Sequence, residues 1–111
     1  MKKDKKSSIC ELKLERTENS LHCYFSGDFV FSNSKIINSY NLKKNLKDIN
    51  KLIIDFADLD RYDSFLVSWL NVISSYCKNK NIEFQILNMS EEAWTFYDFL
   101  KFQKEKFPKL K

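Results

Sequence analysis

The sequence predicts an α/β fold, with a mixed sheet of four to five strands and helices packed on it. Short apolar runs, some with alternating polar residues and some β-branched, alternate along the chain with longer segments in which apolar residues recur at helical spacing. The resulting order of elements is β-β-α-β-α-β-α. The 111 residues suffice for one core and therefore one domain. Strands that alternate with helices are joined by right-handed parallel crossovers, whereas the two leading strands predict an antiparallel hairpin.

The first half of the chain supplies the hairpin and one helix. Residues 7–16 alternate apolar and polar side chains, which is typical of a half-buried strand, and residues 21–26 follow as a second strand after a polar turn. The only glycine, Gly27, predicts a bend there, because glycine alone adopts strained backbone freely. A Ser-Asn-Ser cluster of N-cap residues then predicts a helix over residues 34–49, with Ile36 among its buried residues.

The centre of the chain has the strongest pattern. Residues 51–56 form an apolar, β-branched run that contains the acid Asp55, as expected of a buried strand. We expect an acidic loop over residues 58–63. A helix is predicted from Ser64 to residue 79, because apolar residues, Trp69 among them, fall on one broad face.

The last part of the chain repeats the strand and helix. Residues 82–87 alternate and predict the fourth strand. Ser90, followed by two glutamates, is a favourable helix start, because its hydroxyl and the acids complement the helix dipole. This helix is expected to turn Trp94 inward and to fray beyond Phe102.

The net charge of +4 is unevenly distributed. Residues 1–6 carry +3 and residues 101–111 carry +4, so the remainder carries −3. We therefore expect a domain over residues 7–102 between basic tails at residues 1–6 and 103–111. A nucleic-acid-binding domain places Lys and Arg in a patch on its body, so nucleic acid is not an expected partner.

Several classes of site and location are disfavoured by composition. The three cysteines, Cys10, Cys23 and Cys77, are far apart and have no Cys-x-x-Cys spacing, so we expect them reduced and buried. The only histidine, His22, has no ligand partner nearby in sequence, so neither a metal nor another cofactor is expected. No apolar run approaches the roughly 20 residues needed to span a bilayer. No signal-peptide pattern follows the basic start, so a cytoplasmic chain is predicted.

The stretch LIIDFADLDRYDS at residues 52–64, with the apolar helix after it, resembles the core of the STAS domain family. Members include anti-sigma factor antagonists, the STAS subunit of Mla-type phospholipid transporters and the tails of sulfate transporters. The matching features are the strand with Asp55, the Asp63-Ser64 pair and the helix. The segment Ser26-Gly27-Asp28-Phe29 also resembles the family's early Gly-x-Leu turn. The resemblance spans about residues 12–100 and implies the same fold as the one predicted above.

The resemblance also implies a site. In anti-sigma factor antagonists a partner kinase phosphorylates the serine of such a pair, which makes Ser64 the phosphoacceptor candidate. A phosphate at a helix N-terminus would meet free backbone N–H groups, and Arg61 is close enough in sequence to pair with it. The family continues with a small residue and a glycine, whereas this chain has Phe65 and Leu66. The alternative role for Asp63 and Ser64 is helix capping alone, worth about 1 kcal/mol.

Two non-enzymatic functions stay open. The first is a protein-interaction module resembling anti-sigma factor antagonists, which docks an anti-sigma factor or kinase through Asp58, Asp60, Arg61, Asp63, Ser64 and Ser68. The alternative is a STAS subunit of an Mla-type phospholipid ABC transporter, which contacts the permease and ATPase. Its basic tails would then touch the membrane surface, at roughly 1 kcal/mol for each lysine. Catalysis is not expected, because no second catalytic group is predicted beside Asp55 and a single glycine excludes a Gly-rich phosphate loop.

Overall fold

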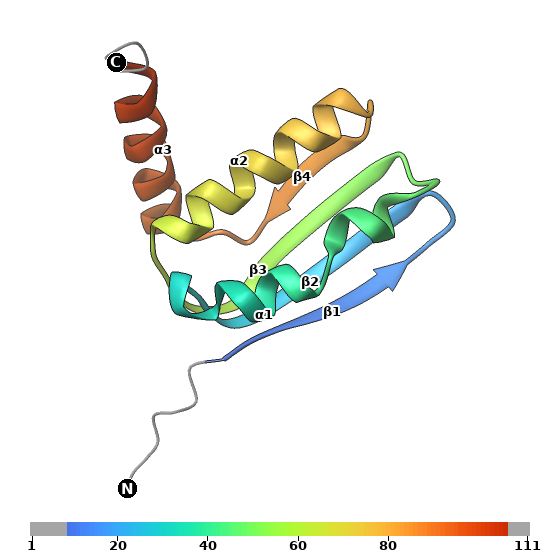
Figure 1. The fold of residues 1–111 in the computed structure, drawn as a ribbon, viewed down its shortest axis with the longest axis horizontal. Helices are drawn as coiled ribbons and strands as arrows, with labels where there is room; N and C mark the ends of the chain where they lie inside the picture. Colours follow the sequence, from blue (N-terminus) through green and yellow to red (C-terminus); the bar gives the residue numbers. More distant parts are fainter. Residues whose placement is uncertain (1–8, 107–111) are drawn as a thin grey trace, which may run out of the picture.

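The structure, a computed structural model, describes residues 9–106 of the chain, with side chains to Lys101. The predicted basic tail at residues 1–6, and residues 107–111 of the other, lie outside the described residues. The strands form one four-stranded sheet in chain order (Figure 1): β1 (Cys10–Arg16), β2 (Ser20–Phe29), β3 (Lys51–Tyr62) and β4 (Glu83–Leu87). β1 pairs antiparallel with β2, and the other two pairings are parallel, which confirms the predicted mixed α/β sheet.

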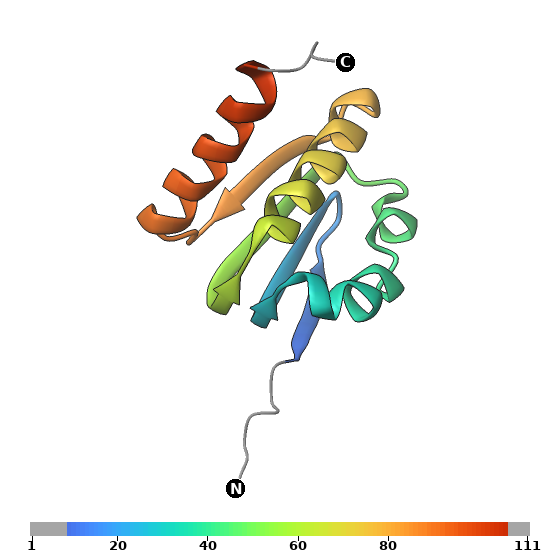
Figure 2. The ribbon, with the colours of Figure 1, turned by 60° about the vertical axis from the view of Figure 1, so that its left-hand side comes forward.

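The helical segments are η2 (Phe31–Asn33), α1 (Ser34–Ser39), η3 (Leu42–Leu46), α2 (Ser64–Asn79) and α3 (Glu91–Lys106). α1, η3 and α2 lie on one face of the sheet, and α3 lies beyond the β4 edge (Figures 1 and 2). Because β2, β3 and β4 are parallel, their carboxyl ends lie at the same end of the sheet. The helical segments η2, α2 and α3 each begin at that end (Figure 1). Within residues 9–106, no helix has the length and apolar character that crossing a membrane requires.

The core lies between the sheet and α2. Alternate residues of β2 and β3 point to α2 and are buried with its apolar face: Leu21, Cys23, Phe25, Leu52, Ile54, Phe56, Leu66, Trp69, Leu70, Ile73 and Cys77. The expected burial of Trp69 in the core is thus confirmed. The cysteines are free and buried, as predicted. Burial raises the pKa of the Cys23 thiol to about 12, so it stays protonated and unreactive at neutral pH.

The helix predicted over residues 34–49 is wrong in length. α1 ends at Ser39, and Asn41 adopts a left-handed backbone (φ 47°) before the short 3₁₀ helix η3 begins. A left-handed residue cannot continue a right-handed helix, and asparagine tolerates that conformation better than most residues. Ile36, expected inside, is 42% exposed, whereas its neighbour Ile37 is buried.

The acidic loop predicted over residues 58–63 is mostly strand. β3 continues to Tyr62 because β2 runs parallel beside it, pairing Ser26 with Asp58 and Phe29 with Tyr62. The pairing has irregular steps on either side of Gly27. The aspartates disfavour a strand locally, but a partner strand on one side overrides that preference.

The last helix follows the prediction at its start and departs from it later. The Ser90 hydroxyl accepts a hydrogen bond from the Ala93 N–H (3.0 Å), which is the expected cap. Trp94 is 37% exposed rather than inward. Ala93 and Tyr97, which we also expect inward, do pack: Ala93 is buried, and the half-buried Tyr97 donates to the Asn71 side chain on α2 (3.2 Å). α3 runs to Lys106, beyond the predicted fraying at Phe102.

Candidate functional site

The end of β3 and the start of α2 carry the predicted site residues, and we call them the α2 tip (Asp58, Asp60, Arg61, Asp63, Ser64 and Ser68). Of these, Asp58 pairs with Ser26 and lines a separate hollow with Lys13 and Tyr24. Asp63 is the N-cap of α2, and its carboxylate accepts the Phe65 N–H (3.0 Å). Both of its oxygens also accept the Phe31 N–H (3.1 Å each). Capping by Asp63 is therefore confirmed, and the same side chain fixes η2 against α2.

Ser64 is the first residue of α2 and is exposed. The bulky residues after it point away from its hydroxyl. Phe65 stacks on Phe29 (ring centroids 5.6 Å apart, 28° between planes), and Leu66 is fully buried. Ser64 thus remains exposed although the bulky Phe65 and Leu66 follow it.

Arg61 pairs with a residue that the sequence reasoning did not assign to it. Its guanidinium donates two hydrogen bonds to one oxygen of Asp28, at 2.7 and 3.1 Å, and Asp28 is only 5% exposed. These bonds raise the pKa of Arg61 and join the ends of β2 and β3. The remaining members Asp58, Asp60 and Ser68 are exposed, so the free charge of the tip is acidic.

Phe31 is a site residue that the sequence analysis missed. Its side chain is 70% exposed, and its ring lies 6.3 Å from that of Phe65. The only local signal was an apolar residue directly before the N-cap cluster, where no strand or helix pattern required one. An exposed aromatic ring therefore adjoins the acids and the hydroxyl of the α2 tip.

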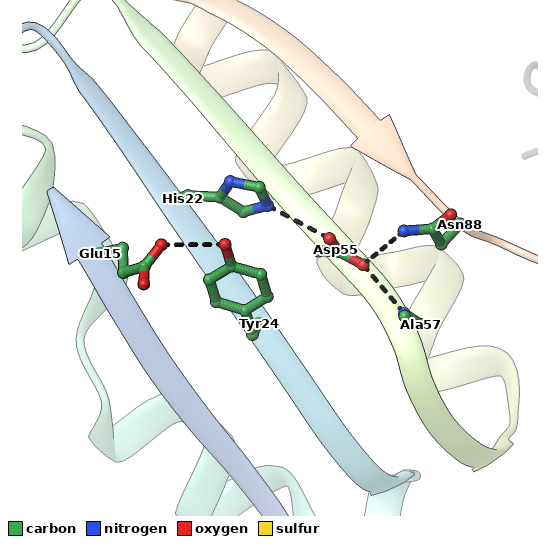
Figure 3. Close-up of polar contacts among 6 residues, drawn as sticks. All are labelled: Glu15, His22, Tyr24, Asp55, Ala57 and Asn88. Atoms are coloured by element: carbon green, nitrogen blue, oxygen red, sulfur yellow. Dashed lines mark hydrogen bonds and ion pairs between the residues drawn. The ribbon is translucent and has the colours of Figure 1, made fainter. Parts of the chain in front are cut away.

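A second polar group lies on the sheet face opposite α2 (Figure 3). Asp55 contacts His22 Nε2 (3.2 Å) and accepts hydrogen bonds from Asn88 (2.9 Å) and the Ala57 N–H (3.0 Å). Tyr24 stacks on His22, with ring centroids 4.2 Å apart. The sequence analysis places no second catalytic group beside Asp55 and no ligand partner near His22 along the chain, so it does not reveal that these two side chains meet. The parallel pairing of β2 with β3 brings the two together.

The Asp55–His22 pair can orient an imidazole, but this alone is not a catalytic site. Burial raises the pKa of Asp55, yet the hydrogen bonds from Asn88, Ala57 and His22 outweigh it and hold the pKa below its ordinary value. Among the hydrogen bonds of residues 9–106, none links His22 to a serine or a cysteine. Over the same residues, no three His, Cys, Asp or Glu side chains gather as metal ligands.

Replacing Asp55 by asparagine should lower the free energy of unfolding by about 2 kcal/mol at pH 7, because the charged acceptor is lost. Since the folded-state pKa of Asp55 is depressed, its stabilisation is present above the ordinary carboxyl pKa and is lost as the pH falls through the lowered value. Urea unfolding at several pH values should therefore show the two proteins converging in acid. Asp58→Asn, at an exposed carboxylate, is the control and should change stability by less than about 0.5 kcal/mol. A constant gap between Asp55→Asn and wild type down to acid pH would contradict this account.

Together the fold and the α2 tip define a small α/β domain that presents a capped, acidic helix start at the carboxyl edge of its sheet. The family model for the STAS domain matches residues 11–108, and the chain belongs to the STAS domain family. This confirms the resemblance that the sequence analysis found.

Two solved structures share the fold. The anti-sigma factor antagonist SpoIIAA in its unphosphorylated form superposes with a TM-score of 0.67 at 16% identity, covering 82% of this chain and 81% of that one. An antisigma-factor antagonist STAS domain from Rhodobacter sphaeroides gives a TM-score of 0.61 at 14% identity, covering 74% and 92%. A search among curated protein sequences found no match.

Proposed function

We propose that this protein is a non-enzymatic, cytoplasmic interaction module of the anti-sigma-factor-antagonist type, which docks a protein partner through the α2 tip. The observation that carries the proposal is the exposure of Ser64 beside Phe31, whose ring is 70% exposed. Two structures with the same fold are antagonists of this type, which supports the same role here.

The α2 tip has the parts that a protein interface uses. Exposed aromatic rings bury much area with little loss of conformational freedom, so Phe31 is suited to anchor a partner. Asp60 is exposed near the end of β3 and adds acidic charge close to the helix start, whereas Asp58 is exposed in a separate hollow that Lys13 and Tyr24 also line. Such charges favour a basic segment of the partner at the tip itself.

Phosphorylation of Ser64 would switch this docking. The Ser64 hydroxyl oxygen would form a bond to the γ-phosphorus of ATP, with ADP leaving and the hydroxyl proton released. Phosphate at the first helical position is favourable for α2 itself, because it meets the positive end of the helix dipole. It adds charge to an already acidic surface, however, and Arg61 is already paired with Asp28. The expected result is release of the partner rather than unfolding.

The test compares matched variants in a pull-down from native lysate, with bound proteins identified by mass spectrometry. Wild type and Ser64→Ala should retain a kinase-type anti-sigma factor, whereas Ser64→Asp and Phe31→Asp should lose it by at least about tenfold. Ser75→Asp is the control, because Ser75 is exposed on the same helix outside the tip. Retention of the same proteins by all five forms would refute the proposal, and phosphate-affinity electrophoresis of the protein from its own cells would show whether Ser64 is modified.

The Mla-type role is a second candidate, favoured by α3. Trp94 and Phe99 are 37% and 57% exposed on this helix, and Lys101 lies over the Tyr97 ring, 5.7 Å from its centroid. Exposed aromatic side chains with a lysine beside them would suit a contact with a membrane-embedded permease. Here co-purification should recover an ATPase and a permease, and Phe99→Asp rather than Phe31→Asp should abolish it.

A further inference from the structure

Residues of α2, η3 and the end of α1 line a groove. Figure 2 shows that these helical segments lie on the same face of the sheet. The groove consists of two adjoining hollows of about 320 and 460 Å³ that share Lys43. We call it the α2 groove. Its α2 side extends from Phe65 to Lys80, which corresponds to roughly 22 Å along a helix axis.

The hollow near the start of α2 is mainly apolar. Its lining includes Ile37, Leu42, Phe65, Trp69, Val72 and Ile73. Val72 is 53% exposed, although it belongs to the most apolar helix of the chain. The polar lining residues, Asn38, Asn41 and Ser68, leave this hollow uncharged except for Lys43. It is a site for apolar side chains with a few polar groups around them.

The hollow near the end of α2 is basic. Lys43, Lys44, Lys47 and Lys80 line it, against the single acid Asp48. Lys43 and Lys80 lie over the Tyr76 ring, with their nitrogens 5.3 and 5.9 Å from its centroid. None of the four lysines takes part in an ion pair among the described residues. The groove therefore concentrates positive charge at one end, although residues 7–100 are acidic as a whole.

We propose that the α2 groove binds an acidic amphipathic segment of a protein partner, with apolar side chains in the first hollow and carboxylates among the lysines. Charge complementarity supports this occupant, because four lysines that form no ion pair with the described part of the chain match several carboxylates better than one small anion. A helix of about 15 residues has the length of the groove. A flat anionic membrane could reach the lysines but could not fill a hollow between two helical segments.

The inference deepens the proposed function by giving a partner chemistry, and it rests on that function only in assigning a protein partner. The α2 groove and the α2 tip share Ser68 alone, so variants can separate them. Loss of partner capture with intact peptide binding would count against the proposed function and not against the groove. Partner capture without peptide binding would refute the proposed role of the α2 groove and leave the proposed function of the α2 tip intact.

The experiment uses a synthetic helical peptide of about 15 residues, with leucines along one face of its first half and glutamates along the same face of its second half. Binding to the full chain is followed by calorimetry and by NMR shifts of backbone amides. Shifts should map to residues lining the groove, and the Lys43→Glu/Lys80→Glu double variant should weaken binding by about tenfold, because each reversal replaces attraction with repulsion. Val72→Asp should weaken it through the apolar hollow.

The matched control is Lys35→Glu/Lys78→Glu, which makes the same change of charge at exposed lysines outside the groove and should leave binding unchanged. A second peptide with lysine in place of glutamate should not bind. The proposal is overturned if the two double variants weaken peptide binding equally, or if the lysine peptide binds as tightly as the glutamate peptide. It is overturned as well if the NMR shifts map to residues outside the α2 groove. It is also overturned if anionic phospholipid vesicles bind the wild type and the glutamate peptide does not.

Discussion

Phe29→Ala is expected to lower the free energy of unfolding by about 4 kcal/mol, the range for removing a fully buried aromatic side chain. Phe29 has no solvent exposure and lies at the centre of the aromatic core. Its ring meets four others at centroid distances of 5.0–5.9 Å, those of Phe25, Phe56, Phe65 and Trp69. The cavity left by alanine cannot collapse, because neighbouring rings are held by the sheet and α2.

Urea unfolding of purified protein measures this loss, and Phe31→Ala is the matched control. The two phenylalanines are close in sequence, but Phe31 is 70% exposed, so its removal should change stability by less than about 0.5 kcal/mol. Phe29→Leu should fall between the two. Equal losses for Phe29→Ala and Phe31→Ala would mean that the aromatic core is not packed as described.

Gly27→Ala is the second substitution with a large expected effect, about 3 kcal/mol. Gly27 has φ +93°, and a Cβ there would lie 2.1 Å from the carbonyl oxygen of Ile9. That same oxygen accepts the Asp28 N–H (2.9 Å). The new methyl group would push β1 away from β2 and disturb the Asp28–Arg61 pair beside the α2 tip.

Amide hydrogen exchange distinguishes this local effect from general destabilisation. Faster exchange in β1 and in the segment after Gly27, with the amides of α2 less affected, is the expected result. Ser26→Ala is the control, because it alters the neighbouring residue of the same strand without a left-handed backbone. If Gly27→Ala had the same free energy of unfolding as the wild type, the chain before β1 could not lie as close to Gly27 as described above.

The expected outcomes at the α2 tip and the α2 groove separate binding from folding. Ser64, Phe31, Val72 and the groove lysines are exposed, so substitutions there should alter partner affinity with little change in unfolding. Substitutions of Phe29, Gly27 and Asp55 should lower the free energy of unfolding, with little change in partner affinity of the folded protein. We expect this separation of effects on partner affinity from effects on stability, because the interaction surface consists of exposed residues on a rigid core.

Local signals were sufficient for the fold class and for α2. The apolar period of residues 64–79 and the cap at Asp63 are properties of neighbouring residues, so the predicted and observed bounds of α2 agree. The resemblance implies a site at the Asp63-Ser64 pair, and Ser64 is exposed in the structure.

Tertiary pairing decided the rest. Arg61 with Asp28 and His22 with Asp55 each join residues 33 positions apart, and no local pattern reports such a contact. The extension of β3 through its aspartates depends on β2 lying alongside it, and the groove exists only where η3 packs beside α2. Periodicity and capping act within a few residues, whereas strand register and surface hollows arise when distant segments share one core.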